Sequence, residues 1–246
     1  MCRLFGSISR KPTGISYWFF DARPHPFKDF SEPPPINGGP HDDGWGIAWM
    51  AGDKWEIFKE GKREKYDFSM INGLKSKLFI VHLRRASKGF DTTKENAHPF
   101  QYKNWVFAHN GGVEGENLLK HLDVTYQAAI QGKTDSEIFF LIIMQFYEET
   151  GDLKKALQKS VELVKETGYR ALNFLLSDGR SLYAYRAVNP NFEAKNDYYS
   201  LHYLRERDSV IFGSDPLDDD RPWKSIGLGE LIEVSADLEL SSHKII

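Results

Sequence analysis

Cys2 is the residue of this sequence with the clearest potential for chemistry. It is the only cysteine among the 246 residues, and Met1 alone precedes it. Because methionine aminopeptidases remove Met when a small residue follows, we expect Cys2 to become the mature N-terminus. Its thiol then lies beside its own α-amine, whose pKa of about 8 allows it to accept the thiol proton near neutral pH. Cys2 would thus supply both the nucleophile and the base.

A lone cysteine also has an ordinary explanation, because free cysteine is often a small buried hydrophobic residue. If Met1 is retained, moreover, the nitrogen of Cys2 stays in an amide and cannot act as a base. A single cysteine excludes an intrachain disulfide and a cysteine-ligated zinc or iron–sulfur site. The chemical interpretation of Cys2 therefore depends on residues elsewhere in the chain.

Six short blocks of sequence supply those residues. They are Cys-Arg-Leu-Phe-Gly at 2–6, His-Asp-Asp-Gly-Trp-Gly at 41–46, His-Leu-Arg-Arg-Ala-Ser at 82–87, Asn-Ala-His-Pro at 96–99, His-Asn-Gly-Gly at 109–112 and Thr-Asp-Ser-Glu at 134–137. In this order they resemble the class II glutamine amidotransferase domain, a branch of the N-terminal nucleophile hydrolases. Residues 43–46 and 173–179 are most similar to its stand-alone members, the YafJ-like proteins and the γ-glutamyl hydrolases that act on ergothioneine precursors or glutathione.

The resemblance implies that Asn110 and Gly111 form an oxyanion hole. An amide side chain and a backbone N–H would stabilise the charge that develops on the carbonyl oxygen, and losing one such donor lowers the rate by roughly 100 to 1,000-fold. An Asn-Gly pair is also the strongest hairpin signal. A tight turn at residues 110–112 is therefore the alternative interpretation, and a turn could itself present the backbone N–H.

Three further residues are implied to bind the substrate. Arg84 matches the arginine that holds the α-carboxylate through two parallel hydrogen bonds, and Asp135 matches the carboxylate that receives the α-ammonium. Ser87 takes the place of a threonine whose hydroxyl assists. The alternatives are a surface salt bridge for Arg84 and, for Asp135, a first-turn residue favoured by the helix dipole.

Two positions depart from many amidotransferases. Arg85 and Lys88 stand where those enzymes have tryptophan and histidine. If these side chains do not face solvent, a more cationic pocket edge favours a substrate larger or more acidic than glutamine, such as a γ-glutamyl peptide with its own carboxylate.

Three histidines in these blocks, His82, His98 and His109, could in principle form a metal site or a Cys-His pair. None has a ligand spacing such as His-x-His or His-x-x-x-His. We therefore expect them to be structural or to support the site, and we expect no metal and no cofactor.

The elements that must position these residues follow from periodicity and capping. Thr134 and Glu137 predict a capping box that opens an apolar helix ending before Gly151, and a second helix over residues 152–166 stops at Gly168. The predicted strands are 2–8, 44–50, 55–59, 78–83, 105–109, 171–176, 181–185, 209–212, 230–234 and 238–245. The proline- and glycine-rich stretch 21–40 is a predicted flap.

The resemblance implies an α+β fold, the four-layer αββα sandwich with two mostly antiparallel sheets. A chain of this length fits one domain over residues 1–246.

Composition limits the possible partners and location. The chain is 41% hydrophobic and 27% charged, with a net charge of -3, and its lysines and arginines are interspersed with acids. Nucleic acid is therefore an unexpected partner. The longest apolar run, residues 138–144, is too short to span a bilayer, and no signal peptide is apparent. We expect a cytoplasmic protein that does not enter a membrane.

The predicted function is hydrolysis of the γ-amide of glutamine or of a γ-glutamyl compound, a small-molecule substrate. Cys2 would form a thioester that water cleaves to release glutamate. One alternative is a glutaminase subunit that delivers ammonia to a separate synthase subunit. The other is a catalytically silent module that binds glutamine or a γ-glutamyl metabolite.

Overall fold

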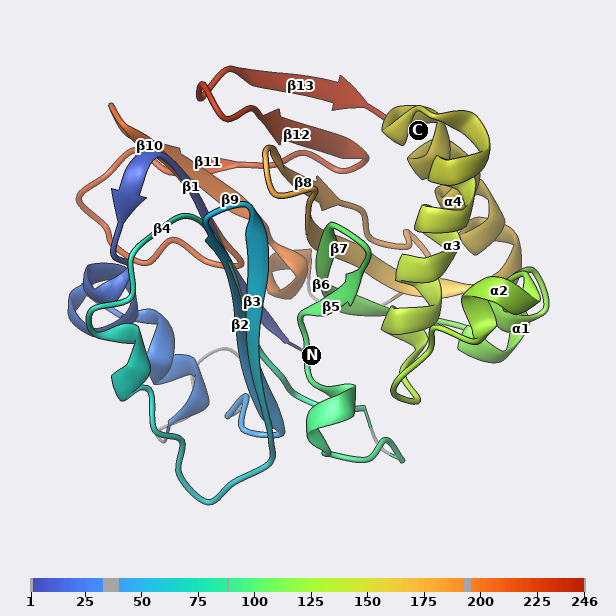
Figure 1. Ribbon diagram of the computed structural model, residues 1–246, viewed down its shortest axis with the longest axis horizontal. Coiled ribbons are helices and arrows are strands. Elements are labelled where there is room, and N and C mark those ends of the chain that lie inside the picture. Colours follow the sequence, from blue (N-terminus) through green and yellow to red (C-terminus); the bar gives the residue numbers. More distant parts are fainter. Residues whose placement is uncertain (1, 33–39, 88, 193–195, 246) are drawn as a thin grey trace.

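Two antiparallel sheets face each other in the computed structural model, which describes residues 2–32, 40–87, 89–192 and 196–245. One sheet contains β1 (Arg3–Thr13), β2 (Gly44–Ala51), β3 (Lys54–Gly61), β4 (Ser76–Leu83), β9 (His202–Arg205), β10 (Ser209–Gly213) and β11 (Lys224–Ser225). Its strand order is β11-β9-β10-β1-β4-β2-β3. The other contains β5 (Phe100–Tyr102), β6 (Trp105–Val113), β7 (Tyr169–Ser177), β8 (Leu182–Arg186), β12 (Glu230–Val234) and β13 (Leu240–Lys244). Its order is β13-β12-β8-β7-β6-β5 (Figure 1).

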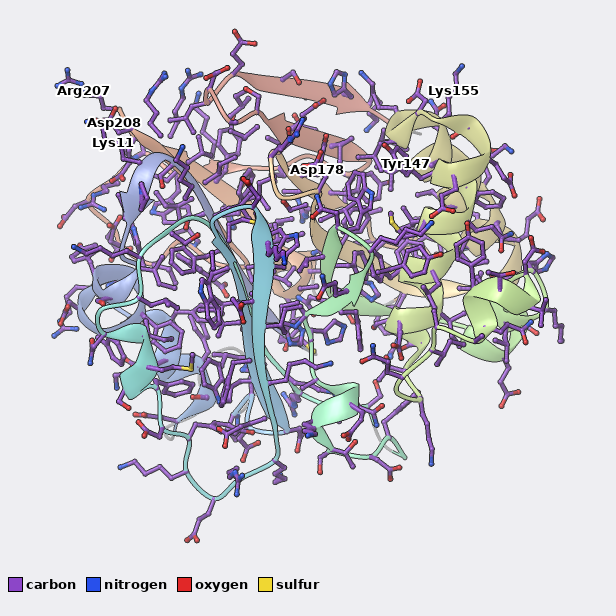
Figure 2. The ribbon with its side chains drawn as sticks, viewed as in Figure 1. Lys11, Tyr147, Lys155, Asp178, Arg207 and Asp208 are labelled. Carbon is purple, nitrogen blue, oxygen red and sulfur yellow. The ribbon has the colours of Figure 1, made fainter. Side chains whose placement is uncertain are left out.

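Apolar side chains fill the space between the sheets, and Figure 2 shows the side chains of the described residues on the ribbon. Leu4 and Ile8 of β1 pack there with Leu175 of β7. Gly6 lies between them in sequence, and a Cβ at this position would approach Leu175 Cδ1 to 2.8 Å. A glycine here lets the two sheets approach closely, next to the strand end that carries Cys2.

Two long helices cover the outer face of the sheet that contains β6 (Figure 1). They are α3 (Asp135–Thr150) and α4 (Leu153–Thr167), and the short helices α1 (Gly115–Leu119) and α2 (Val124–Gln127) lie beside them. Phe107 of β6 stacks on Phe140 of α3 with ring centroids 5.1 Å apart and planes 2° apart. This aromatic contact joins the helical layer to the sheet.

Short helical turns cover the opposite sheet. They are η1 (Tyr17–Asp21), η2 (Phe27–Ser31) and η3 (Ser69–Ile71), whose buried side chains pack with those of β1, β2 and β4. The predicted α+β sandwich with two antiparallel sheets is confirmed, although its fourth layer consists of turns instead of long helices. No helix in the described ranges is long and apolar enough to cross a membrane.

The predicted helices are confirmed, with one correction to their caps. Thr134 accepts the N–H of Glu137 at 3.3 Å, and Gly151 ends α3 with φ 64°. The Glu137 carboxylate, however, accepts the N–H groups of Gln131 and Gly132 at 2.9 and 2.8 Å. The reciprocal half of the predicted capping box is therefore wrong, because this carboxylate fastens the preceding loop instead.

The predicted strands overlap strands of the structure, and three short ones escaped prediction. These three, β5, β9 and β11, have two to four residues each and show no clear alternation. In the predicted flap, Phe27 and Phe30 pack against the sheet, while residues 33–39 lie outside the described part of the chain.

We predict that Phe107→Ala lowers the free energy of unfolding by roughly 3–5 kcal/mol, because it leaves a cavity under α3. Val124→Ala is the control, since Val124 is 79% exposed. Urea unfolding of both variants measures the difference. A similar effect from the two substitutions would contradict this packing.

Candidate functional site

A small cavity of about 30 Å³ surrounds Cys2, which is itself only 9% exposed. Its lining contains Cys2, Arg84, Arg85, Ala86, Ser87, Phe90, His98, His109, Gly111, Thr134, Asp135 and Ser136. Five of the six predicted site residues are in this lining, and the sixth, Asn110, is hydrogen-bonded to Cys2. The cavity holds about one or two water molecules. The residues that the sequence singled out thus meet at one place.

Strand pairing and a helix start bring these residues together. Arg3 lies opposite Leu83 in the antiparallel pair of β1 and β4, so Cys2 and Arg84 are adjacent at the ends of these strands. The Thr134 cap makes Asp135 the first residue of α3, and Asp135 Oδ2 accepts the N–H of Val113 at 2.9 Å. This bond fastens the helix start to the end of β6.

Asn110 connects Cys2 to the facing sheet. The backbone N–H of Cys2 donates to Asn110 Oδ1 at 3.0 Å, and the thiol lies 3.7 Å from the carbonyl oxygen of Arg85. Asn110 Nδ2 is buried and has no hydrogen-bond acceptor among the described residues. Leaving a buried donor unpaired costs about 1–3 kcal/mol. The same side-chain amide therefore binds the nitrogen of the candidate nucleophile through its oxygen and has an unused donor on its nitrogen.

The alternative interpretation of residues 110–112, a tight turn, is wrong. Asn110 and Gly111 lie inside β6, opposite Asn173 and Leu172 of β7. A Cβ on Gly111 would lie 1.9 Å from the carbonyl oxygen of Ala171. The glycine is thus required by close packing within the sheet, whereas the Asn-Gly hairpin signal was overridden by strand pairing.

Arg84 is buried, so it does not form the surface salt bridge that was the alternative. Its Nη1 donates to the carbonyl oxygens of Asp91 at 2.8 Å and Asp43 at 3.4 Å. No described residue accepts a hydrogen bond from its Nε or Nη2. Burial lowers the pKa of Arg84, while negative charge at Cys2, Asp43 and Asp135 acts in the opposite direction. A charged guanidinium edge is therefore available beside the cavity.

Asp135 fits both of its interpretations. Its Oδ1 accepts the N–H of Ser136 at 2.9 Å at the start of α3, as expected of a first-turn carboxylate. Asp135 Oδ2, which accepts only the N–H of Val113 among the described residues, retains a further lone pair, and the residue lines the cavity. Its role at the helix start therefore does not prevent it from binding a cation.

Arg170 contacts the lining of the cavity, and it was not predicted from the sequence. Its Nη2 donates to Ser87 Oγ at 3.0 Å, and a Cβ on Gly112 would lie 2.5 Å from the same nitrogen. Arg170 lies in none of the sequence motifs. Its position over Gly112 depends on the pairing of β6 with β7, which the local sequence does not predict. Arg85 lines the cavity as predicted for a cationic edge, and Lys88 lies outside the described residues.

Buried histidines hold the framework behind the cavity. His109 Nε2 donates to the Ala171 carbonyl at 3.1 Å, so its Nδ1 accepts from Ser136 Oγ at 2.9 Å. His82 Nε2 donates to the His109 carbonyl at 3.1 Å. Burial lowers the pKa of His109 to about 4 and that of His82 to about 3. Both rings are therefore neutral at pH 7 and join β6 to β4 and α3.

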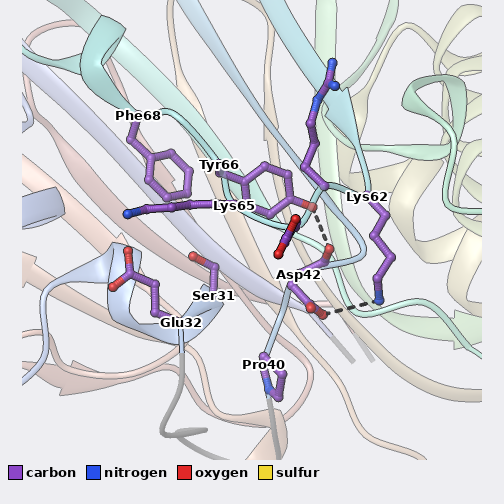
Figure 3. Close-up of a pocket in the computed structure, with 10 residues that line it drawn as sticks. Ser31, Glu32, Pro40, Asp42, Lys62, Lys65, Tyr66 and Phe68 are labelled. Atoms are coloured by element: carbon purple, nitrogen blue, oxygen red, sulfur yellow. Dashed lines mark hydrogen bonds and ion pairs between the residues drawn. The ribbon is translucent and has the colours of Figure 1, made fainter.

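A second, larger cavity of about 1120 Å³ lies elsewhere (Figure 3). Its lining contains Ser31, Glu32, Pro40, Asp42, Lys62, Arg63, Glu64, Lys65, Tyr66 and Phe68. None of these lines the cavity at Cys2, and three cationic side chains are balanced by three carboxylates. The larger cavity thus has no charge preference and no nucleophilic cysteine, so the smaller one remains the candidate site.

We predict that acid destabilises the folded protein through the buried histidines His82 and His109. The unfolded pKa of histidine is about 6.5, so between this value and the folded pKa the unfolded chain binds more protons. The free energy of unfolding should then fall by up to about 2 kcal/mol per buried histidine between pH 7 and pH 5. His109→Gln should weaken this dependence, whereas His121→Gln, at an exposed position, should not. Equal pH dependence in the two variants, measured by urea unfolding, would refute the assignment.

Comparison with known proteins identifies the family. The sequence matches the family "Glutamine amidotransferases class-II" over residues 1–241. It is 27% identical to Escherichia coli YafJ, which is named as a glutamine amidotransferase, over 94% of this chain and 96% of that protein. It is 25% identical to the γ-glutamyl-hercynylcysteine sulfoxide hydrolase of Mycobacterium tuberculosis, over 78% of this chain and 75% of that protein.

A solved structure shows the same fold. The glutamine aminotransferase class-II domain protein from Silicibacter pomeroyi aligns over 100% of both chains, with a TM-score of 0.68 and 22% identity. The resemblance inferred from the six sequence blocks is confirmed by the family match. This chain belongs to the class II glutamine amidotransferases, a family of amide-cleaving enzymes.

Proposed function

We propose that the protein hydrolyses the γ-amide of glutamine or of a γ-glutamyl compound, with Cys2 as the nucleophile. The observation that carries this proposal is the hydrogen bond from the Cys2 nitrogen to Asn110 Oδ1, on the same amide whose Nδ2 has no acceptor among the described residues. Once Met1 is removed, the same contact orients a free α-amine. The unused amide donor is then available to the oxygen of a carbonyl that Cys2 attacks.

The reaction takes place in two stages. The α-amine of Cys2 accepts the thiol proton, and the sulfur adds to the γ-carbonyl carbon, whose oxygen becomes negative. Asn110 Nδ2 and the backbone N–H of Gly111 stabilise this oxygen. The ammonium returns its proton to the leaving nitrogen as the carbon–nitrogen bond breaks. Water then attacks the thioester, its proton passes through the amine to the sulfur, and glutamate leaves.

The glutamyl end is recognised by charge. The Nε–Nη2 edge of Arg84 can hold the α-carboxylate through two parallel hydrogen bonds, and Asp135 can hold the α-ammonium. A glutamyl group exceeds the cavity of about 30 Å³. Substrate binding would therefore require this cavity to widen.

Glutamate release from glutamine, glutathione and other γ-glutamyl amides tests the function. Protein whose intact mass shows loss of Met1 should release glutamate from at least one of them. Cys2→Ala should have no activity, and Asn110→Ala should lose roughly 100 to 1,000-fold in kcat because an oxyanion donor is gone. Binding of these compounds without glutamate release would instead favour a silent binding module.

The leaving group is the second determinant of the substrate. Arg170 binds Ser87 at the cavity wall, and no other hydrogen bond of its guanidinium joins it to the described residues. Together with Arg85 it makes the edge of the site cationic. This favours γ-glutamyl compounds whose leaving group carries a carboxylate over glutamine itself.

We predict that Arg170→Met lowers kcat/KM for a γ-glutamyl peptide by roughly 10 to 100-fold, the effect of one charge-assisted hydrogen bond. Its effect on glutamine should be much smaller, because ammonia carries no carboxylate. Arg180→Met, at an exposed arginine, is the matched control. An equal decrease in kcat/KM for both substrates would show that Arg170 supports Ser87 and does not bind the leaving group.

A further inference from the structure

Asn173 lies directly across the sheet from Asn110. The two are register partners in the antiparallel pair of β6 and β7, so their side chains share one face with Cβ atoms about 4.5–5.5 Å apart. Ala108 and Leu175, two residues away on each strand, belong to the core between the sheets. Both asparagines therefore face the same space as Cys2, and both are fully buried.

Hydrogen bonds fix the orientation of the Asn173 amide. Its Nδ2 donates to the carbonyl oxygens of Tyr199 at 2.9 Å and Ser200 at 3.5 Å. If the amide were flipped, Oδ1 would face these two carbonyl oxygens in place of Nδ2. Both hydrogen bonds would then be lost, because an oxygen acceptor cannot donate to them. Asn173 Oδ1 is buried, and no described residue donates a hydrogen bond to it. The protein thus keeps an unused acceptor opposite the asparagine that binds the Cys2 nitrogen.

The number of hydrogens on the Cys2 nitrogen explains this unused acceptor. In an amide that nitrogen has one hydrogen, which Asn110 Oδ1 accepts. A free α-amine has two hydrogens when neutral and three when protonated. Each additional hydrogen in a buried site requires an acceptor of its own. An oxygen that has no donor before Met1 is removed would gain one afterwards.

We propose that Asn173 Oδ1 is the second acceptor for the α-amine of Cys2, so that Asn110 and Asn173 hold the amine between them. This inference rests on the proposed role of Cys2. With two hydrogens bound to two acceptors, the neutral amine has its lone pair free for the thiol proton. Asn173 is in this sense a positioning residue: it orients the base and does not touch the substrate.

The titration of the Cys2 amine tests the proposal without requiring turnover. Because the chain has a single cysteine, protein labelled with ¹³C-cysteine and freed of Met1 gives one Cys2 Cα resonance, whose shift follows the amine. Losing an acceptor in Asn173→Leu should lower the amine pKa by roughly one unit. Asn173→Asp keeps an acceptor and adds negative charge, so it should raise that pKa. The low-pH limb of kcat/KM should move in the same directions.

Arg186→Met is the matched control for a structural role of Asn173. Arg186 Nε also donates to the Tyr199 carbonyl, at 2.8 Å, so this variant loosens the same anchor. It should leave the Cys2 titration unchanged. Unshifted titration in both Asn173 variants, or an equal shift in Arg186→Met, would overturn the proposal. If wild-type protein shows the titration but releases no glutamate, the proposed function fails while the role of Asn173 stands.

Discussion

The hydrogen bond between the Cys2 nitrogen and Asn110 is the contact on which the site depends, because it joins the two sheets of the sandwich. Cys2 precedes a strand of one sheet, and Asn110 lies within a strand of the other. Such a bond forms only where the sheets approach closely, and Gly6 permits this. A second tie between the same sheets, from His82 to the His109 carbonyl, reinforces it. The packing of the sandwich thus sets the position of the candidate nucleophile.

Two buried polar groups of the core lower the stability of the folded protein at the candidate site. Asn110 Nδ2 and Asn173 Oδ1 belong to register partners of β6 and β7, and neither has a hydrogen-bond partner among the described residues, at a cost of about 1–3 kcal/mol each. Apolar residues at both positions would avoid that cost. Their presence is consistent with partners that arrive later, a free amine at Cys2 and the oxygen of a bound substrate.

The sequence predicted which residues lie together in the candidate site better than it predicted the contacts among them. Cys2, Arg84 and Asp135 could be found because they lie in ordered motifs near predicted strand and helix ends. The positions of Arg170 and Asn173 beside the candidate site could not be predicted, because they depend on the register of β6 with β7. Local signals also misled at residues 110–112, where pairing with β7 outweighs the turn preference of an Asn-Gly pair.

Formation of a thioester on Cys2 tests the central claim most directly. Protein with and without Met1 would be mixed with a γ-glutamyl substrate, quenched in acid and digested, and the N-terminal peptide weighed. We expect a mass increase of one glutamyl group on the peptide that begins with Cys2, and none on the peptide that retains Met1. A glutamyl group on the Met1-retaining peptide, or glutamate release without any adduct on Cys2, would contradict a mechanism in which the free amine of Cys2 is the base.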